Sequence, residues 1–542
     1  MTCFADEAGT LSPPLWTPRG RQGYVTLLFF AALLAVCAAV LFIGVPRSRA
    51  YGHDVLMPLD GAWRLLNGQR PGADFYAILG PAWYMVNAFG LTLAKGKATG
   101  LAYATAITTL VVGLWAWALL HRRMTPFAWL LAALFLVLIA AAPFVLGEGF
   151  GRTTFCSKYN RFGYAFLGLV LLECVLREEG MTWRSRFASG FSSGAACAVC
   201  LFLKVSFGAV GLGLIACLFP FRRLDSVRLG GIVAGLALMS LPFLAFVRFD
   251  VAALVREYRM LAGIRGSFIS YTDIMRTMFA DRWELTIGTV LAFFVILLPS
   301  VEPRRKVILT IAWCICLGVG QLLMQTNFQP SGLPLSAMLT ILMLDEVTRA
   351  VRAGFTSAPH GHLLLTLSAA GALLPMAPEG LGLAYASVDK TLHPRLGYHF
   401  EEPQLAGLDF LDGRFFDPFD NGQYLVGFMS EGFALLREHS RPHESIASLS
   451  QANIFPYALG RRPANNGAVF LAMTSVGEND RIPPLTTLIG DADILMVPKY
   501  ETPDRIVMRH ILARYPELLG AQYQFVAESA HWKLYRRVGT AG

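Results

Sequence analysis

Long apolar runs separated by short polar connections occupy most of the first 384 residues. A helix that crosses a bilayer needs about 20 predominantly apolar residues, and these runs reach that length. The pattern therefore predicts a polytopic α-helical membrane protein with about eleven transmembrane helices. The apolar piece at 79–94 is short and contains Gly80-Pro81, so we expect it to dip into the membrane without crossing it. The predicted spans are 23–45, 99–120, 126–147, 162–177, 188–204, 205–221, 228–247, 284–300, 306–325, 331–346 and 361–382.

Basic residues at the ends of these runs predict how the chain is oriented. Cytoplasmic connections of membrane proteins carry an excess of lysine and arginine. Placing the basic clusters inside makes residues 1–22 a cytoplasmic tail, and makes 23–384 a membrane domain with long outer loops at 46–98 and 248–283. The connection 148–161 then lies on the same side as the first outer loop. The clusters include Arg122-Arg123, Arg222-Arg223 and Arg304-Arg305-Lys306.

Residues 385–542 have a different pattern, in which glycine, proline, aspartate and asparagine separate short apolar segments and no further span occurs. Helical and strand periods both appear, which predicts an α/β domain of a size that can fold alone. An odd number of crossings places this domain outside the cytoplasm. The predicted elements are helices at 421–439 and 505–519, strands at 445–450 and 493–498, and a strand pair at 523–527 and 532–537.

The composition excludes a soluble globular chain, because 55% of the residues are hydrophobic, 15% are charged and the mean hydropathy is +0.50. The net charge of +9 does not indicate a nucleic-acid partner, since the basic residues cluster at the ends of apolar runs. We expect membrane lipids, and no nucleic acid, as partners.

The stretch 51–84, directly after the first span, is the most informative part of the chain. A proline at a helix start, a glycine just past a helix end and apolar residues between them predict a short amphipathic helix. Its polar side carries Asp60, Arg64 and Asn67, so we expect this helix to lie in the membrane interface. An acid beside such a helix is well placed for chemistry on a lipid headgroup.

The same stretch resembles the first external loop of GT-C glycosyltransferases, the polytopic enzymes that take sugars from polyprenyl-phosphate carriers. The resemblance rests on Asp54 directly after the first span, the run AWRLLNGQRP at 62–71, ADF at 73–75 and GPAWY at 80–84. It extends loosely over the middle spans and hardly at all over the C-terminal domain. The group includes protein mannosyltransferase-like and aminoarabinose-transferase-like enzymes, so the resemblance implies a GT-C-like fold with interfacial helices.

The resemblance also implies an activity and a location. Hexose or pentose would pass from a polyprenyl-phosphate donor to a glycan, lipid or protein acceptor, with inversion at the sugar carbon. The reaction would take place at the outer face of a bacterial inner (cytoplasmic) membrane. The sequence does not identify the sugar or the acceptor.

Such a transfer needs a base for the acceptor, donors for the departing phosphate and a groove for the polyprenyl chain. The resemblance implies that Asp54 is the base or the acceptor-orienting group, while the residue type alone also fits a helix-capping acid. Asp74 is either a second acid or a turn residue before Phe75. His53 stands where the family often has another acid, and it is a candidate substrate contact.

Basic residues that reach the outer face are candidates for holding the donor phosphate. Lys204 lies between two apolar runs that fit a hairpin, near whose tip it either contacts phosphate or reaches out to the lipid headgroups. The planar fork of Arg161 suits a phosphate, and an anchor at a helix start is the alternative. The other candidates are Tyr159 and Asn160 beside Arg161, and Arg256 and Arg259 in the second long outer loop, 248–283, which is rich in arginine.

Cofactors and other function classes stay open. No grouping of His, Cys, Asp and Glu has metal-site spacing, and a divalent cation is used by some GT-C enzymes and not by others. An O-antigen polymerase or ligase would use a lipid-diphosphate donor and would not need Asp54 after the first span. A lipid or sugar transporter predicts inverted repeats and charges near the bilayer midplane. A scaffold that binds a partner through its external domain is the remaining alternative.

Overall fold

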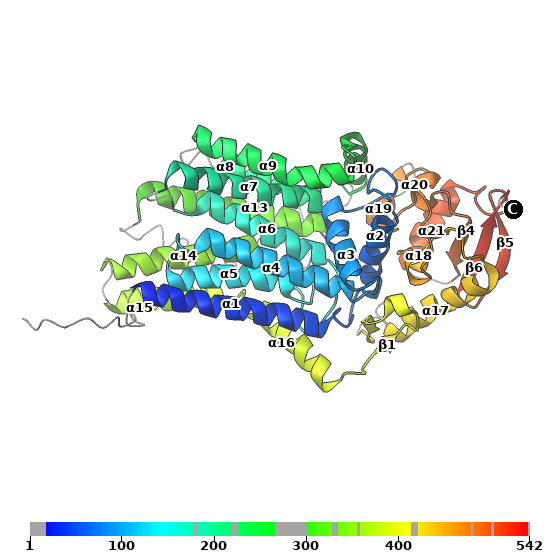
Figure 1. Cartoon of the computed structure of the whole chain (residues 1–542), viewed down its shortest axis with the longest axis horizontal. Helices are drawn as coiled ribbons and strands as arrows, with labels where there is room; N and C mark the ends of the chain where they lie inside the picture. The colour runs from blue at the N-terminus through cyan, green and yellow to red at the C-terminus, as the bar shows by residue number, and fades with distance from the viewer. Residues whose placement is uncertain are drawn as a thin grey trace, which may run out of the picture.

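The structure is a computed structural model that describes residues 18–177, 181–218, 225–265, 301–327, 334–354, 358–413, 421–477, 481–499 and 503–539. A long bundle of helices occupies one end of the molecule, and the C-terminal α/β domain occupies the other (Figure 1). The predicted span 284–300, the first 17 residues of the tail and the second half of the arginine-rich loop lie outside the described residues.

The bundle confirms a helical membrane protein. Among the described helices, five are long and apolar enough to cross a membrane, namely those that contain Gln22–Ile43, Gly100–Leu120, Trp183–Leu203, Ser226–Phe246 and Pro303–Met324. The total of about eleven crossings stays a prediction. The bundle helices are α1 (Pro18–Ile43), α4 (Gly100–Leu120), α5 (Pro126–Ala141), α6 (Lys158–Val175), α7 (Trp183–Leu203), α8 (Val205–Leu218), α9 (Ser226–Phe246), α13 (Pro303–Asn327), α14 (Pro334–Arg352), α15 (Ala358–Leu373) and α16 (Ala377–Leu392).

Glycines bring α7 and α9 unusually close together. A Cβ added at Gly194 of α7 would lie 2.0 Å from the carbonyl oxygen of Ile232, and one added at Gly235 of α9 would lie 2.1 Å from that of Phe191. Small residues at a helix crossing let the backbones approach, and this is a common way to pack helices in membranes.

The predicted span 361–382 is wrong as a single helix, because the structure divides it into α15 and α16. Pro375 in the connection cannot donate a backbone hydrogen bond, and Pro378 sits in the first turn of α16. Helix α16 also continues to Leu392, past the predicted domain boundary at 384. Its polar end is stabilised by Asp389, which forms ion pairs with two arginines of the first loop.

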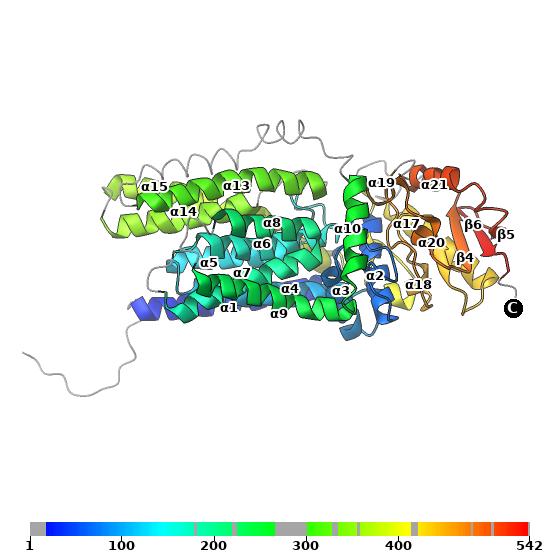
Figure 2. The same cartoon turned by 90° about the horizontal axis from the view of Figure 1, so that it is seen from above.

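Three short elements connect the bundle to the C-terminal domain: η1 (Gly52–Val55), α2 (Leu56–Leu66) and α3 (Pro81–Leu93). Helix α3 lies within the piece predicted to dip into the membrane, and its 13 residues are fewer than a crossing needs. Helix α10 (Val251–Arg265) lies across the direction of the bundle helices at this junction (Figure 2).

The expectation that the polar side of α2 faces the interface is wrong. Asp60 is fully buried and Arg64 is 1% exposed. Arg64 pairs with Asp60 at 3.0 Å and donates a 3.1 Å hydrogen bond to the carbonyl of Ala464 in the C-terminal domain. The C-terminal domain therefore covers Asp60 and Arg64, and its backbone carbonyls, rather than water, accept hydrogen bonds from Arg64.

The C-terminal domain is built on a four-stranded mixed sheet in the order β3-β4-β6-β5. Strand β3 (Ile446–Ser448) pairs in parallel with β4 (Ile494–Pro498), and the other pairs, β4 with β6 (Trp532–Arg537) and β6 with β5 (Tyr523–Glu528), are antiparallel. The remaining elements are β1 (Tyr398–His399), η4 (Pro403–Leu405), β2 (Asp409–Phe410), α17 (Gly422–His439), α18 (Phe455–Ala458), α19 (Met473–Val476), α20 (Leu485–Ile489) and α21 (Pro503–Arg514).

These elements confirm most of the secondary structure predicted for the domain. Helix α17 fills the predicted 421–439 and is capped by the Asn421 side chain, which accepts a hydrogen bond from the backbone of Tyr424. The four predicted strands are present. The helix predicted at 505–519 ends at Arg514, because Pro516 disfavours a helical conformation at the residue before it.

The first loop and the C-terminal domain are joined over a continuous surface. The indole nitrogen of Trp63 donates a 2.8 Å hydrogen bond to the carbonyl of Arg461. The backbone N–H of Tyr76 donates to the carbonyl of Gly467 at 2.9 Å. Residues from both parts also belong to one hydrophobic core. The C-terminal domain is thus packed against the loop rather than tethered to it.

Candidate functional site

The carboxylate of Asp54 lies in η1, directly after the first helix, and each of its oxygens has a named partner. The Nε2 atom of His53 lies 3.2 Å from Oδ1, and the thiol of Cys156 lies 2.6 Å from Oδ2. The Asp54 side chain remains 24% exposed. Burial raises the pKa of this carboxyl, but the charge and hydrogen bond of His53 and the hydrogen bond of Cys156 outweigh burial and hold the pKa below its ordinary value. Asp54 is therefore ionised at neutral pH and can accept a proton.

The connection at 148–161 packs against this segment, as the sequence predicts. The Tyr51 hydroxyl donates a 2.8 Å hydrogen bond to Glu148, whose other oxygen pairs with Arg152 at 3.0 Å. The Arg152 guanidinium lies over the Tyr51 ring, 5.4 Å from its centre. Tyr51 has a positive φ of 53°, which turns the chain sharply at the start of η1. These contacts fix the position of the backbone that carries Asp54.

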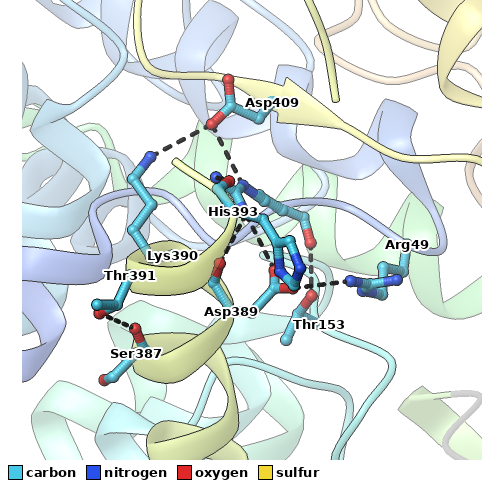
Figure 3. A network of polar contacts seen from close by, with 9 residues as sticks. Arg49, Thr153, Ser387, Asp389, Lys390, Thr391, His393 and Asp409 are labelled. Carbon is cyan, nitrogen blue, oxygen red and sulfur yellow. Dashed lines mark hydrogen bonds and ion pairs between the residues drawn. The ribbon is translucent and has the colours of Figure 1, made fainter. Parts of the chain in front are cut away.

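A second polar network joins the start of the first outer loop and the connection at 148–161 to α16 (Figure 3). Asp389 pairs with Arg47 at 3.1 Å and with Arg49 at 3.2 Å. The carbonyl of Arg47 accepts a 2.7 Å hydrogen bond from the Thr153 hydroxyl. Asp409 of β2 forms an ion pair with Lys390 at 3.3 Å. The network joins the first loop, the connection that carries Cys156, the end of the bundle and the start of the C-terminal domain.

The C-terminal domain contributes a wall to the site. The ring of Phe470 stacks on His53, with ring centres 6.2 Å apart and an angle of 24° between the planes. Phe470 is 9% exposed and pairs with Ala452 through an isolated bridge. Sequence reasoning missed this residue, since nothing in the pattern around Phe470 distinguishes it from the other buried aromatic residues of the domain.

Lys204 and Tyr159, predicted as separate substrate contacts, lie together. Lys204 is the single residue between α7 and α8, so the predicted hairpin is confirmed. Its Nζ lies over the Tyr159 ring, 5.0 Å from the centre, and the Tyr159 ring meets the edge of Trp83 at 5.8 Å. The backbone N–H of Gly80 donates to the carbonyl of Leu203 at 3.0 Å. The hairpin tip thus sits against the turn of the first loop at residues 80–84.

A pocket with a mostly apolar lining adjoins this cluster, at the ends of α1, α4 and α5 that face the C-terminal domain. The side-chain nitrogen of Lys158 forms part of its wall and donates 2.8 Å hydrogen bonds to the carbonyls of Ala141 and Ala142. Burial, followed by the charge of Arg161, lowers the pKa of Lys158 well below its ordinary value. Phe155 lines the pocket and also contacts Trp83, with ring centres 6.2 Å apart. Phe155 directly precedes Cys156, so neighbouring residues of one segment contact the pocket and the Asp54 carboxylate.

The other predicted site residues lie elsewhere. Asp74 pairs with Arg70 at 2.7 Å in the turn after α2, the arrangement expected of a turn residue. Arg161 is 1% exposed and pairs with Glu379 at 2.6 Å, which links α6 to α16. Asn160 is fully buried beside it. Among the described contacts, none joins Asp74 or Arg161 to the Asp54 carboxylate.

Arg256 and Arg259 are exposed on the outer side of α10, while Leu254 and Glu257 are buried on its inner side. The first part of the outer loop at 248–283 is therefore an amphipathic helix. Within the described residues, no group of three or more His, Cys, Asp and Glu side chains could hold a metal ion.

No family model matches the chain, and no curated protein matches it. Solved structures that match the fold of this chain include two of one protein. One is ArnT from Cupriavidus metallidurans bound to undecaprenyl phosphate, with a TM-score of 0.45 and 15% identity over 96% of this chain and 99% of that chain. The other is the same enzyme in the apo state, with a TM-score of 0.42 and 14% identity over 95% and 98% of the two chains. The similarity concerns the overall arrangement of the chain.

Proposed function

We propose that the protein is a membrane glycosyltransferase that moves a sugar from a polyprenyl-phosphate donor to an acceptor. The observation that carries the proposal is the Asp54 carboxylate, held on both oxygens by His53 and Cys156. It is joined by Lys204, whose Nζ lies over Tyr159 against the first-loop turn at residues 80–84. A base for the acceptor and a cation for the departing phosphate are two of the parts that this reaction requires.

In the proposed reaction the acceptor attacks the anomeric carbon of the donor sugar. The new bond forms as the bond from that carbon to the phosphate oxygen breaks, and the polyprenyl phosphate leaves with the electron pair. Asp54 takes the proton that the acceptor loses. Lys204 stabilises the negative charge that builds up on the departing phosphate, because a preorganised cation is most effective where charge develops.

The arrangement of basic residues supports an outward-facing site. Arg123 pairs with Glu173, and Arg177 and Arg305 both pair with Glu346. Glu173 and Arg177 lie at the C-terminal end of α6, the opposite end from Lys158 and the first loop. Lysine and arginine concentrate on the cytoplasmic side of membrane proteins. We therefore place Asp54 and the C-terminal domain at the outer face of a bacterial inner membrane, with the N-terminus in the cytoplasm.

The exposed Arg256 and Arg259 of α10 complete the proposal, because a crosswise helix with outward arginines suits anionic lipid headgroups or a polyprenyl phosphate. The acceptor, which can be a glycan, a lipid or a protein, would enter beside His53 and Phe470.

The test is transfer of radiolabelled sugar from polyprenyl-phosphate donors by membranes that contain the wild type, Asp54→Asn or Asp74→Asn at equal protein levels. The asparagine keeps the size of the side chain and removes its charge. We expect Asp54→Asn to lower the rate about 10²–10⁴-fold, the range for removal of a general base, and Asp74→Asn to retain it. Equal loss in both variants would make Asp74 a second acid. Wild-type activity that survives in Asp54→Asn would refute the site, and no transfer from any monophosphate donor would refute the function.

A further inference from the structure

We propose that Cys156 is a positioning residue for Asp54, whose thiol holds one carboxylate oxygen while His53 holds the other. The inference rests on the proposed function of Asp54 and adds a residue to that site. Cys156 itself would touch neither the sugar nor the acceptor.

Two residues from different parts of the chain each hold one oxygen of the Asp54 carboxylate. His53 is the sequence neighbour of Asp54, whereas Cys156 comes from 102 residues further along the chain. The Cys156 thiol lies 2.6 Å from Oδ2 and 3.4 Å from the Ser157 hydroxyl. A carboxylate turns readily about its last side-chain bond, since that torsion is broad. With a partner on each oxygen, the carboxylate keeps one orientation, and its remaining lone pairs point in fixed directions.

The segment that carries Cys156 is itself held in place. The Cys156 backbone N–H donates a 3.1 Å hydrogen bond to the Thr154 hydroxyl, and the Thr153 hydroxyl donates to the carbonyl of Arg47. The Cys156 side chain is 7% exposed. These hydrogen bonds hold the backbone of the connection between α5 and α6, and burial restricts the rotation of the thiol away from Asp54.

The thiol remains a donor at neutral pH. Burial, followed by the charge of Asp54, raises the pKa of Cys156 well above its ordinary value. A protonated, buried thiol is not a nucleophile, which separates this role from covalent catalysis. A thiol is also a weaker donor than a hydroxyl. It can orient the carboxylate while leaving Asp54 more basic than a serine at the same position would.

The first experiment compares the pH dependence of transfer for the wild type, Cys156→Ala and Cys156→Ser. Loss of a hydrogen bond to a charged group costs about 1.5–3 kcal/mol, or roughly 10–100-fold. We expect Cys156→Ala to lower kcat by that factor, to leave KM for the donor unchanged and to move the acid limb to higher pH. Cys156→Ser should recover most of kcat and move the acid limb to lower pH. Cys174→Ala, which removes a buried thiol at the other end of α6, is the control and should behave as the wild type.

Two outcomes would overturn the proposal. One is a wild-type pH profile and kcat in Cys156→Ala. The other is equal impairment of the alanine and serine variants, which would indicate packing alone.

A second readout does not depend on activity, so it separates failure of this inference from failure of the proposed function. The rate of Cys156 alkylation is measured by mass spectrometry across pH in the wild type and in Asp54→Asn. Removing the adjacent negative charge should lower the pKa of the thiol and shift the alkylation profile to lower pH. Identical profiles in the two proteins would refute the contact itself.

Discussion

Arg64 of helix α2 donates a hydrogen bond of 2.9 Å to the backbone carbonyl of Asn466, 402 residues further along the chain. The same guanidinium group pairs with Asp60 one turn earlier on the helix. A polar stripe on a short helix thus becomes the surface on which the C-terminal domain docks. The domain in turn supplies Phe470, which stacks on His53, so docking of the domain also forms one wall of the candidate site.

The first prediction concerns the buried pair of Asp60 and Arg64. Removing one partner of a buried ion pair leaves an unpaired buried charge, at a cost of about 3–5 kcal/mol. We expect Asp60→Ala to lower the stability by that order and to expose the segment at residues 461–467 to protease. Thermal unfolding of the detergent-solubilised protein, followed by limited proteolysis, measures both effects.

The chain offers a matched control in Arg70 and Asp74, which have the same four-residue spacing but lie near the surface, with side chains 24% and 30% exposed. A pair of that kind contributes about 0.2–1 kcal/mol. Asp74→Ala should therefore change the melting temperature little. Similar losses in Asp60→Ala and Asp74→Ala would contradict the importance of burial at the docking surface.

The second prediction concerns Phe470 and its stack on His53. Phe470→Leu keeps most of the apolar volume but removes the aromatic face, and aromatic stacking contributes about 0.5–1.5 kcal/mol. We expect transfer to fall by roughly 2–10-fold, the equivalent of that energy. Phe455→Leu is the control, because Phe455 is buried in the same domain against Phe433 and Trp532. Comparable stability in the two variants with reduced transfer only in Phe470→Leu would support the wall, and equal activity would argue against it.

The sequence predicts those parts of the site that depend on order along the chain. Asp54 follows the first span, and Lys204 stands between two apolar runs, so the site loop and the hairpin tip are visible without a structure. The contact between residues 51–54 and 148–156 also follows from placing the basic clusters on one side.

The rest depends on partners that are remote in sequence. The sequence suggests that Arg161 is a phosphate ligand. In the structure Arg161 pairs instead with Glu379, which lies 218 residues away in the chain. The sequence pattern predicts that the polar side of α2 faces water, because periodicity does not show whether water or the polar groups of another domain contact that side. Cys156 carries no signal of its own, since a single cysteine is usually a small core residue.

The third prediction concerns Lys204 and its position over Tyr159. If Lys204 stabilises the departing phosphate, Lys204→Met should lower kcat by about 10²–10³-fold, as for loss of one donor to a developing charge. Lys204→Arg should recover part of the rate, since the charge remains and the shape differs. A lysine that only reaches the lipid headgroups would leave transfer unchanged in Lys204→Met. Initial rates at saturating and limiting donor, with protein levels matched, distinguish these results.

The fourth prediction concerns the pH dependence of stability at the junction of α10 with the first loop. Glu257 is 4% exposed, and its carboxyl accepts a hydrogen bond from the backbone N–H of Ala77. Burial raises the pKa of Glu257 well above its ordinary value, although the Ala77 hydrogen bond opposes the shift. The folded protein therefore favours the neutral carboxyl. The contribution of the neutral Glu257 carboxyl to the free energy of unfolding is complete below the ordinary pKa of about 4.3. That contribution is lost as the pH rises through the folded-state pKa.

Glu257→Gln keeps an acceptor for Ala77 and cannot ionise, so we expect its stability to exceed that of the wild type increasingly from pH 5 towards pH 8. The exposed Glu438, with 75% of its side chain accessible, supplies the control variant Glu438→Gln. Melting temperatures in detergent at each pH measure the difference. A constant difference between Glu257→Gln and the wild type would mean that Glu257 does not titrate in this range. A difference that grows with pH, and is absent for Glu438→Gln, would establish that α10 docks on the first loop through a neutral carboxyl.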